Sequence, residues 1–357
     1  MKLILVPVVL LTTLFSSAAE KVVLVAGGGS NTNTAIPLKA TKAKLNGPFG
    51  VDFDSAGNLY IVEMTGNRVR KLDGNGMLTV IAGTGEKGAK DGPGLAAQFN
   101  GPHNLAISAN RMFLADTWNN CVRVMDLDTG NVRRVIGTGE KGFAGDGFEA
   151  SLATFGGIYC ISVGGNKVLY LADLDNSRIR AVNPNMRLVV PTMTVAGNGT
   201  KGVPAEGAIA AASPLNDPRA VIADALGQVY ILERGGNSLR IVDTNGTIRT
   251  LVGTGQKGNT GDGGDAKQAT LNGPKHLCFD HDGNVLIADT ENHVIRKYLT
   301  HEGKIVRVAG TGKKGNKGLG GPPLDVELNQ PHGVYVHKDG TLYISDSSNH
   351  RVLKVVK

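Results

Sequence analysis

Residues 99–123 read FNGPHNLAISANRMFLADTWNNCVR, and variants of this segment recur along the chain. Two of them are LNGPKHLCFDHDGNVLIADTENHVIR at 271–296 and LNQPHGVYVHKDGTLYISDSSNHRVL at 328–353. Copies begin near residues 45, 99, 155, 215, 271 and 328, a period of about 55 residues that suits one four-stranded blade and a long loop. Because six copies fill almost the whole chain, the repeat is the unit that decides the fold.

Each copy contains four strand-like runs rich in β-branched residues. In the first copy they are Phe49–Phe53, Leu59–Glu63, Arg68–Leu72 and Leu78–Ala82. The first two runs are separated by DSAGN (54–58), a tight hairpin turn in which Asp accepts backbone N–H groups and Gly supplies a positive φ. The pattern predicts an antiparallel four-stranded meander.

Glycine-rich linkers follow the fourth strand, and five of them match G-x-G-x-x-G, beginning with GTGEKG at 83–88. One such match is typical of a phosphate-binding loop, but that loop opens a helix. Here each match leads into another strand, which excludes a dinucleotide site. The linkers instead carry the chain from the outer strand of one blade to the inner strand of the next.

The two ends of the chain complete one another. The sixth copy has only three strands, whereas Lys21–Ala26 (KVVLVA) resembles a fourth strand. We therefore predict an all-β fold: a six-bladed β-propeller of four-stranded antiparallel blades, closed by the N-terminal strand joining the C-terminal blade. Residues 20–357 form a single propeller domain in this prediction.

Residues 1–19 read MKLILVPVVLLTTLFSSAA, with a basic start, a short apolar run and a small-residue end. This pattern predicts a signal peptide cleaved before Glu20, and hence a secreted or periplasmic protein; a retained membrane anchor is the alternative. No transmembrane segment is expected in the mature chain, which we expect to be a monomer.

The net charge of +7 comes largely from basic residues that recur once per repeat. Charge spread around a ring argues against nucleic acid as a partner and favours an extracellular or envelope protein, peptide or glycan. The three cysteines, Cys121, Cys160 and Cys278, lie in apolar strands of different copies, so we interpret them as buried small hydrophobic residues.

Two sets of positions converge on the face that carries the linkers and the loops between second and third strands. The first set is acidic in every copy, which favours a structural role in binding loop N–H groups over a cation-attracting ring. An arginine seven residues later is interpreted as the partner of an acid in a neighbouring blade, with Leu353 breaking the pattern in the last copy. The acids are Glu63, Asp116, Asp173, Glu233, Asp289 and Asp346.

The second set opens the innermost strands and varies between copies, which suits a binding site better than a scaffold. Its members are Phe49, His103, Tyr159, Arg219, Lys275 and His332. Trp118, in the loop of the second blade, suits stacking on a sugar or peptide, although packing under the linker is the interpretation we favour. The ligand-binding candidates are therefore His103, Trp118, Tyr159, Arg219, Lys275 and His332.

The repeat resembles that of the NHL-repeat family, six-bladed propellers with a pattern like P-x-G-V-A-V-D-x-x-G-N-L-Y-I-A-D-T-x-N-x-R-I. PHGVYVHKDGTLYISDSSNHRV near the C-terminus carries the resemblance most clearly, and the linkers are similar to those of a secreted bacterial subgroup. Because this family includes enzymes, receptors and scaffolds, the resemblance implies the fold more than the activity.

PHNL (102–105) and PHGV (331–334) also resemble the P-H-S-L motif of the amidating-lyase branch, which implies a zinc held by histidines. His103 and His332 are the two positions that match, and His276 is shifted by one residue, which turns its side chain to the other side of the strand. Because a catalytic zinc takes three protein ligands, this set is incomplete. GDG at 145–147 and GDGGD at 261–265 lack the alternating oxygen ligands of a calcium loop and are interpreted as turns.

We therefore expect a non-catalytic binding propeller. The alternatives are a lyase or lactone hydrolase, with a zinc or calcium ion in some forms of that hypothesis, and a purely structural module.

Overall fold

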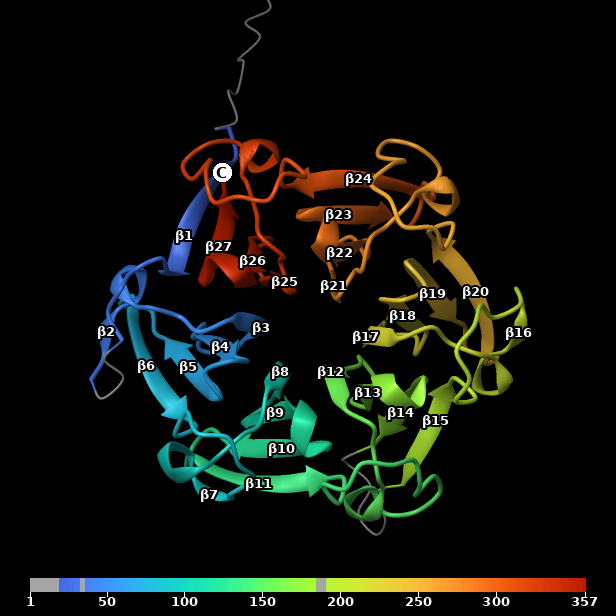
Figure 1. The fold of residues 1–357 in the computed structure, drawn as a ribbon, viewed down its shortest axis with the longest axis horizontal. Coiled ribbons are helices and arrows are strands. Elements are labelled where there is room, and N and C mark those ends of the chain that lie inside the picture. Colours follow the sequence, from blue (N-terminus) through green and yellow to red (C-terminus); the bar gives the residue numbers. More distant parts are fainter. Residues whose placement is uncertain (1–18, 33–35, 184–190) are drawn as a thin grey trace, which may run out of the picture.

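The computed structural model describes residues 19–32, 36–183 and 191–357. Six antiparallel sheets stand around a central axis like the blades of a propeller, as predicted (Figure 1). Of the predicted signal peptide, residues 1–18 lie outside the described ranges.

Each blade contributes one strand to each of four concentric rings. The innermost strands are β3 (Pro48–Phe53), β8 (Pro102–Ser108), β12 (Ile158–Val163), β17 (Pro218–Ala223), β21 (His276–Phe279) and β25 (Gly333–Val336). The second strands are β4 (Leu59–Glu63), β9 (Arg111–Asp116), β13 (Leu169–Asp173), β18 (Val229–Glu233), β22 (Val285–Asp289) and β26 (Leu342–Asp346). The third strands are β5 (Arg68–Leu72), β10 (Cys121–Asp126), β14 (Arg178–Val182), β19 (Ser238–Val242), β23 (Val294–Leu299) and β27 (Arg351–Val356).

The outer strands are β6 (Met77–Ala82), β11 (Asn131–Ile136), β15 (Thr192–Ala196), β20 (Thr247–Val252), β24 (Lys304–Ala309) and β1 (Lys21–Gly27). Blades are numbered 1 to 6 from β3 to β25. Three blades also have a fifth, two-residue edge strand: β2 (Leu38–Lys39), β7 (Gly92–Pro93) and β16 (Ala208–Ile209). The prediction of four strands is thus incomplete for blades 1, 2 and 4. There the returning linker runs beside the outer strand and pairs with it.

The described residues also include ten short 3-10 turns. Six lie in the stretches that lead to the blades: η1 (Ala40–Lys42), η2 (Gly94–Ala96), η4 (Ala150–Leu152), η6 (Ala210–Ala212), η7 (Ala266–Gln268) and η9 (Pro323–Asp325). Four lie between second and third strands: η3 (Thr117–Asn119), η5 (Leu174–Asn176), η8 (Thr290–Asn292) and η10 (Ser347–Asn349). No helix in the described ranges is long and apolar enough to cross a bilayer.

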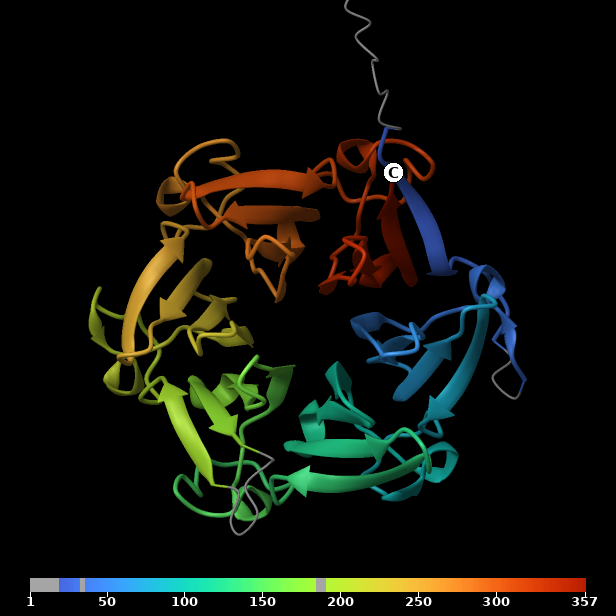
Figure 2. The same cartoon turned by 180° about the vertical axis from the view of Figure 1, so that it is seen from behind.

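The ring is closed as predicted, by β1 from the N-terminal end pairing with β27 from the C-terminal end (Figures 1 and 2). The register runs from Lys21 opposite Val356 to Gly27 opposite Arg351. Val22 and Ala26 of β1 are fully buried. This pairing covers the edge of β27, so blade 6 has a complete set of four concentric strands like every other blade.

The hydrophobic core lies between neighbouring blades. For example, Phe155, Ile161 and Leu171 of blade 3 pack in one cluster with Phe113 and Val124 of blade 2. The strand residues that face a sheet's neighbours alternate with residues that face the other side, as the period of two requires. The blades therefore stabilise one another, and the inner strands are held in place around a narrow channel.

The cysteines are free, and Cys121 and Cys160 are buried as predicted. Cys278 is half-buried and lines the channel. Burial raises the pKa of the Cys160 thiol to about 11 and that of Cys121 to about 12, so neither is a reactive thiolate at neutral pH.

Candidate functional site

The acids that end the second strand of every blade belong to the scaffold. Each is fully buried, and one oxygen of each accepts the backbone N–H of a residue that precedes the inner strand. Each also pairs, at 2.7–3.8 Å, with a buried arginine of the third strand. The structural interpretation of this set is confirmed. The pairs are Glu63–Arg70, Asp116–Arg123, Asp173–Arg180, Glu233–Arg240, Asp289–Arg296 and Asp346–Arg351.

One detail of the arginine prediction is wrong. The partners come from one blade and not from neighbouring blades, because the arginine and the acid lie on the same side of two paired strands. In blade 6, Leu353 stands where the other blades have the arginine. Arg351, which lies directly opposite Asp346, pairs with the acid instead. Its Nε atom donates to the Asp346 carboxylate at 2.7 Å.

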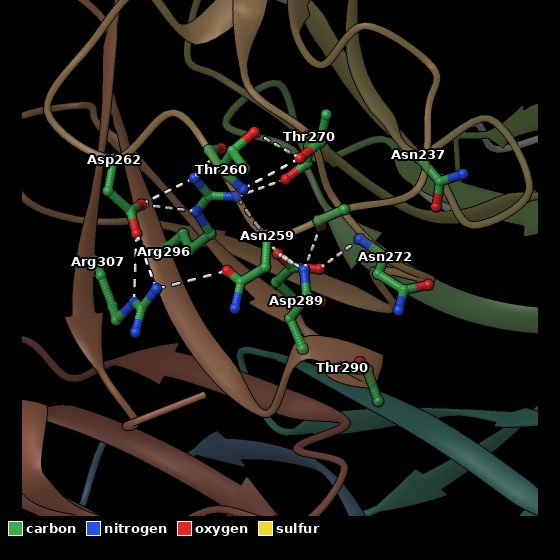
Figure 3. A network of polar contacts seen from close by, with 12 residues as sticks. Asn237, Asn259, Thr260, Asp262, Thr270, Asn272, Asp289, Thr290, Arg296 and Arg307 are labelled. Carbon is green, nitrogen blue, oxygen red and sulfur yellow. Dashed lines mark hydrogen bonds and ion pairs between the residues drawn. The ribbon is translucent and has the colours of Figure 1, made fainter. Parts of the chain in front are cut away.

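Figure 3 shows how completely such an arginine is bonded in blade 5. Arg296 donates from Nε to Asp262 at 2.9 Å and from Nη1 to the Thr270 carbonyl at 2.7 Å. Its Nη2 atom donates to the Thr260 carbonyl at 2.8 Å. Asp262 belongs to the GDGGD linker and also pairs with Arg307 at 3.1 Å. Because arginines occupy this carboxylate, the interpretation of GDGGD as a turn and not a calcium loop agrees with the structure.

The variable positions do come together, at the mouth of the channel. Phe49 stacks on His332 with ring centroids 4.1 Å apart and meets His103 edge-on at 5.2 Å. His103 in turn meets Tyr159 at 4.7 Å, and the guanidinium of Arg219 lies 4.5 Å from the Tyr159 ring centroid. Five side chains from blades 6, 1, 2, 3 and 4 thus form one continuous arc of contacts.

Lys275, the sixth member, lies in blade 5 and donates from Nζ to Glu291 at 2.6 Å. Its charge lowers the pKa of both His103 and His332, together with the charge of Arg219. The mouth therefore has an aromatic side, formed by blades 6 and 1–3, and a cationic side, formed by blades 4 and 5.

Trp118 extends the aromatic side outward. Its indole lies 5.9 Å from the His103 ring and packs on Gly101, where any side chain would collide with it. The residue remains 46% exposed, so the packing that we favoured from the sequence does not bury it. The Nζ atom of Lys87 lies 5.6 Å from the indole centroid. An indole held at this position has a surface available to a ligand.

Both histidines of the arc are held in one orientation by the backbone. His103 donates from Nδ1 to the Gly101 carbonyl at 2.7 Å, and His332 donates from Nδ1 to the Gln330 carbonyl at 2.7 Å. Burial, aided by Arg219 and Lys275, holds the pKa of each ring well below its usual range. Both imidazoles are therefore neutral at pH 7, with Nε2 as a hydrogen-bond acceptor.

The residues at the mouth do not fit a catalytic zinc. An imidazole that donates from Nδ1 to a carbonyl is oriented as metal ligands often are. However, Phe49 lies against both rings, and the charges that act on both imidazoles include the cations Arg219 and Lys275, which disfavour a bound metal cation. Within the described ranges, no three or more His, Cys, Asp or Glu side chains are grouped to hold a metal.

His276 lies deeper, in the channel itself. It occupies the position of Asn104 in blade 2, since each pairs with the alanine that precedes the acid of the second strand. The two side chains meet across the channel, with His276 Nε2 3.0 Å from Asn104 Nδ2. A cavity of about 170 Å³ at this level is lined by all six inner strands. His276 is therefore separate from the arc at the mouth.

Sequence comparison identifies one of the repeats. The NHL repeat matches residues 328–355, the sixth copy of the segment that builds every blade. The chain is a six-bladed β-propeller with an NHL repeat in its last blade. It is 28% identical over 283 residues to the protein SUPPRESSOR OF QUENCHING 1, chloroplastic, of Arabidopsis thaliana, covering 75% of this chain and 26% of that protein. It is 26% identical over 336 residues to NHL repeat-containing protein 2 of Bos taurus, covering 85% of this chain and 46% of that protein.

The NHL propeller thus spans between about a quarter and about half of the length of these relatives. Among solved structures, it is similar to a structural genomics protein of unknown function from Bacteroides thetaiotaomicron (TM-score 0.70, 16% identity, 95% of this chain and 76% of that one). An auxiliary nutrient binding protein from the same species has a TM-score of 0.67 at 14% identity, over 94% of this chain and 76% of that one.

A streptogramin B lyase has a TM-score of 0.54 at 12% identity, over 95% of this chain and 98% of that one. At such identities the likeness establishes the fold alone. One propeller architecture thus serves both a protein described as binding nutrients and an enzyme. The function of this NHL propeller therefore depends on the residues at its own channel mouth.

Proposed function

We propose that this NHL propeller is a binding module that takes a small ligand at the channel mouth, on the face that carries the linkers. The observation that supports this is the continuous arc of contacts among Phe49, His103, Tyr159, Arg219 and His332. The blades do not need these side chains to pair their strands. The side chains place aromatic faces, neutral Nε2 acceptors and a cation around one opening. Such a combination of apolar surface and a few oriented polar groups is typical of small-ligand sites.

A direct test uses Trp118, the single tryptophan of the chain, as the reporter. A screen of neutral and acidic oligosaccharides and short peptides should find a ligand that changes Trp118 fluorescence and raises Tm. Substitution of His332 by Ala should weaken that ligand at least about tenfold, since a stacked and hydrogen-bonding side chain is lost. Leu226→Ala serves as the control, because Leu226 is an exposed apolar residue in a turn between first and second strands. Equal affinity in the His332 and Leu226 variants would contradict the proposal.

The second candidate is a lyase or lactone hydrolase acting at the same mouth. It is favoured by the two neutral histidines near Arg219, since a neutral imidazole is a general base and a guanidinium stabilises a developing anion. Turnover of a bound lactone or hydroxy acid that disappears in His103→Gln, with binding retained, would establish this candidate over the first. Binding without turnover supports the module.

We also propose that the protein works outside the cytoplasm, as the pattern of residues 1–19 suggests. Expression of the full-length chain in a bacterial host should then yield exported protein whose N-terminal residue is Glu20, as measured by intact-mass spectrometry. An unprocessed chain retained in the cytoplasm or membrane would contradict this. The ligand would accordingly be an extracellular or envelope glycan, peptide or protein segment.

A further inference from the structure

Arg219 differs from every other buried arginine in the described part of the chain. The six scaffold arginines each have a carboxylate partner within 4 Å. Arg219 is only 5% exposed, and no described carboxylate pairs with it. Its single hydrogen bond to a described residue runs from Nη1 to the Tyr159 carbonyl, at 3.3 Å. The Nε and Nη2 edge of the guanidinium has no acceptor among the described residues.

This arrangement favours an anion from outside the chain. A buried charge without a counter-ion is unfavourable, and burial lowers the pKa of Arg219 to about 10, which still leaves it a cation at neutral pH. The charge of Arg219 also lowers the pKa of His103, His276 and His332, which come from three different blades. Arg219 therefore acts on the histidines of the mouth and on His276 deeper in the channel.

A cleft of about 580 Å³ opens between blades 4 and 5, and its lining includes Asp217, two residues before Arg219. Its charged lining is Arg234, Lys257 and Lys275 against Asp217 and Glu291. Both acids are already engaged, Asp217 with Lys201 and Arg234, and Glu291 with Lys275. The lining carries three cations against two acids and so has a net positive charge, and Lys257 is the cation that no described carboxylate pairs with.

Resting on the proposed function, we propose that the ligand is an acidic oligosaccharide with a carboxylate on each sugar. One carboxylate binds the free Nε and Nη2 edge of Arg219, whose two parallel donors match its two oxygens. A second lies in the cleft near Lys257 and Lys275. The exposed indole of Trp118 on the aromatic side offers a stacking surface to a sugar ring, which favours a uronate over an acidic peptide.

The test compares trigalacturonate with galactotriose, its neutral counterpart, and with triglutamate, by Trp118 fluorescence and calorimetry. Trigalacturonate should bind with an affinity that falls as salt is added, while galactotriose should bind at least about tenfold more weakly. Arg219→Gln should reduce the affinity for trigalacturonate about tenfold or more, and Lys257→Gln severalfold. Arg249→Gln, an exposed arginine on the outer strand of blade 4, is the matched control and should have no effect.

Each other outcome overturns the inference at an identifiable step. If galactotriose binds as tightly as trigalacturonate and Arg219→Gln does not change its affinity, the ligand's carboxylates are not recognised. The proposed function would still hold. If triglutamate binds more tightly than trigalacturonate, the ligand is an acidic peptide and not an acidic sugar. Absence of any response to the three probes overturns the acidic-oligosaccharide inference, while the wider ligand screen decides the proposed function separately. Circular dichroism and Tm of the Arg219→Gln protein establish that it is folded, and Trp118 remains as the reporter in every variant.

Discussion

Removal of residues 20–27 is expected to lower Tm by on the order of 10 °C and to make the protein prone to aggregation. The deletion removes β1, which pairs with β27 along its length and buries Val22 and Ala26. Blade 6 would then end at the unpaired edge of β27, next to a hydrophobic cluster opened on one side. Differential scanning fluorimetry and light scattering measure both effects.

Two point variants distinguish the loss of ring closure from a general sensitivity of the N-terminal strand to substitution. Val22 is fully buried in the cluster between blades 5 and 6, while the neighbouring Val23 points to the other side of the strand and is half-buried. Val22→Lys should reproduce most of the loss in Tm, and Val23→Lys should cost much less. An unchanged Tm in the deletion variant would show that the ring does not depend on this strand.

Substitution of Arg296 by Met is expected to lower the free energy of unfolding by about 3–5 kcal/mol at pH 7–8, as when one partner of a buried ion pair is removed. The change leaves Asp289 buried without its cation and deprives Asp262 and the carbonyls of Thr260 and Thr270 of their donors (Figure 3). Urea unfolding followed by circular dichroism measures the loss.

The loss should depend on pH in a defined direction. Burial raises the pKa of Asp289 from 3.8 to about 6 even with Arg296 present. A carboxyl group whose pKa is higher in the folded state binds extra protons there, so its effect on stability becomes less favourable as pH rises through that range. Without Arg296 the carboxylate is still harder to keep charged. The Arg296→Met variant should therefore be closer to wild type at pH 5 than at pH 8.

Arg219→Met provides the contrast. Both arginines are buried, but Arg219 has no carboxylate partner among the described residues, so its removal relieves an uncompensated charge. In the absence of ligand, this variant should stay within about 1 kcal/mol of wild type or be more stable. A loss as large as that of Arg296→Met would show that the guanidinium is stabilised from within the protein, and would argue against an external anion.

Much of the scaffold was predictable because its signals are local and repeated six times. The strand bounds in the first copy differ from those in the structure by at most one residue, since alternation and turn chemistry act over a few residues. The closing strand was predictable because one blade lacked a strand and Lys21–Ala26 matched it. The two-residue strands β2, β7 and β16 were missed, because such short segments have no periodicity of their own and pair only when the linker returns to the sheet.

The candidate site shows a similar division. Its positions follow from the repeat, since one place per blade at the start of the inner strand must face the same opening. The sequence also shows that these places hold different residues while the neighbouring acids are kept. It does not show which side chains touch, so the stack of Phe49 on His332 and the exposure of Trp118 came only from the folded ring.

By itself, then, the sequence determined the six-bladed β-propeller, its closure and the six positions around the mouth, because each rests on a pattern repeated within the chain. Only the tertiary structure decided which charges are compensated. Arg70 and Arg219 are both buried arginines on β-strands, yet one lies 2.9 Å from Glu63 and the other has no described carboxylate partner. Ion pairing depends on distances of a few ångströms between strands and blades, and these distances exist only once the ring has closed.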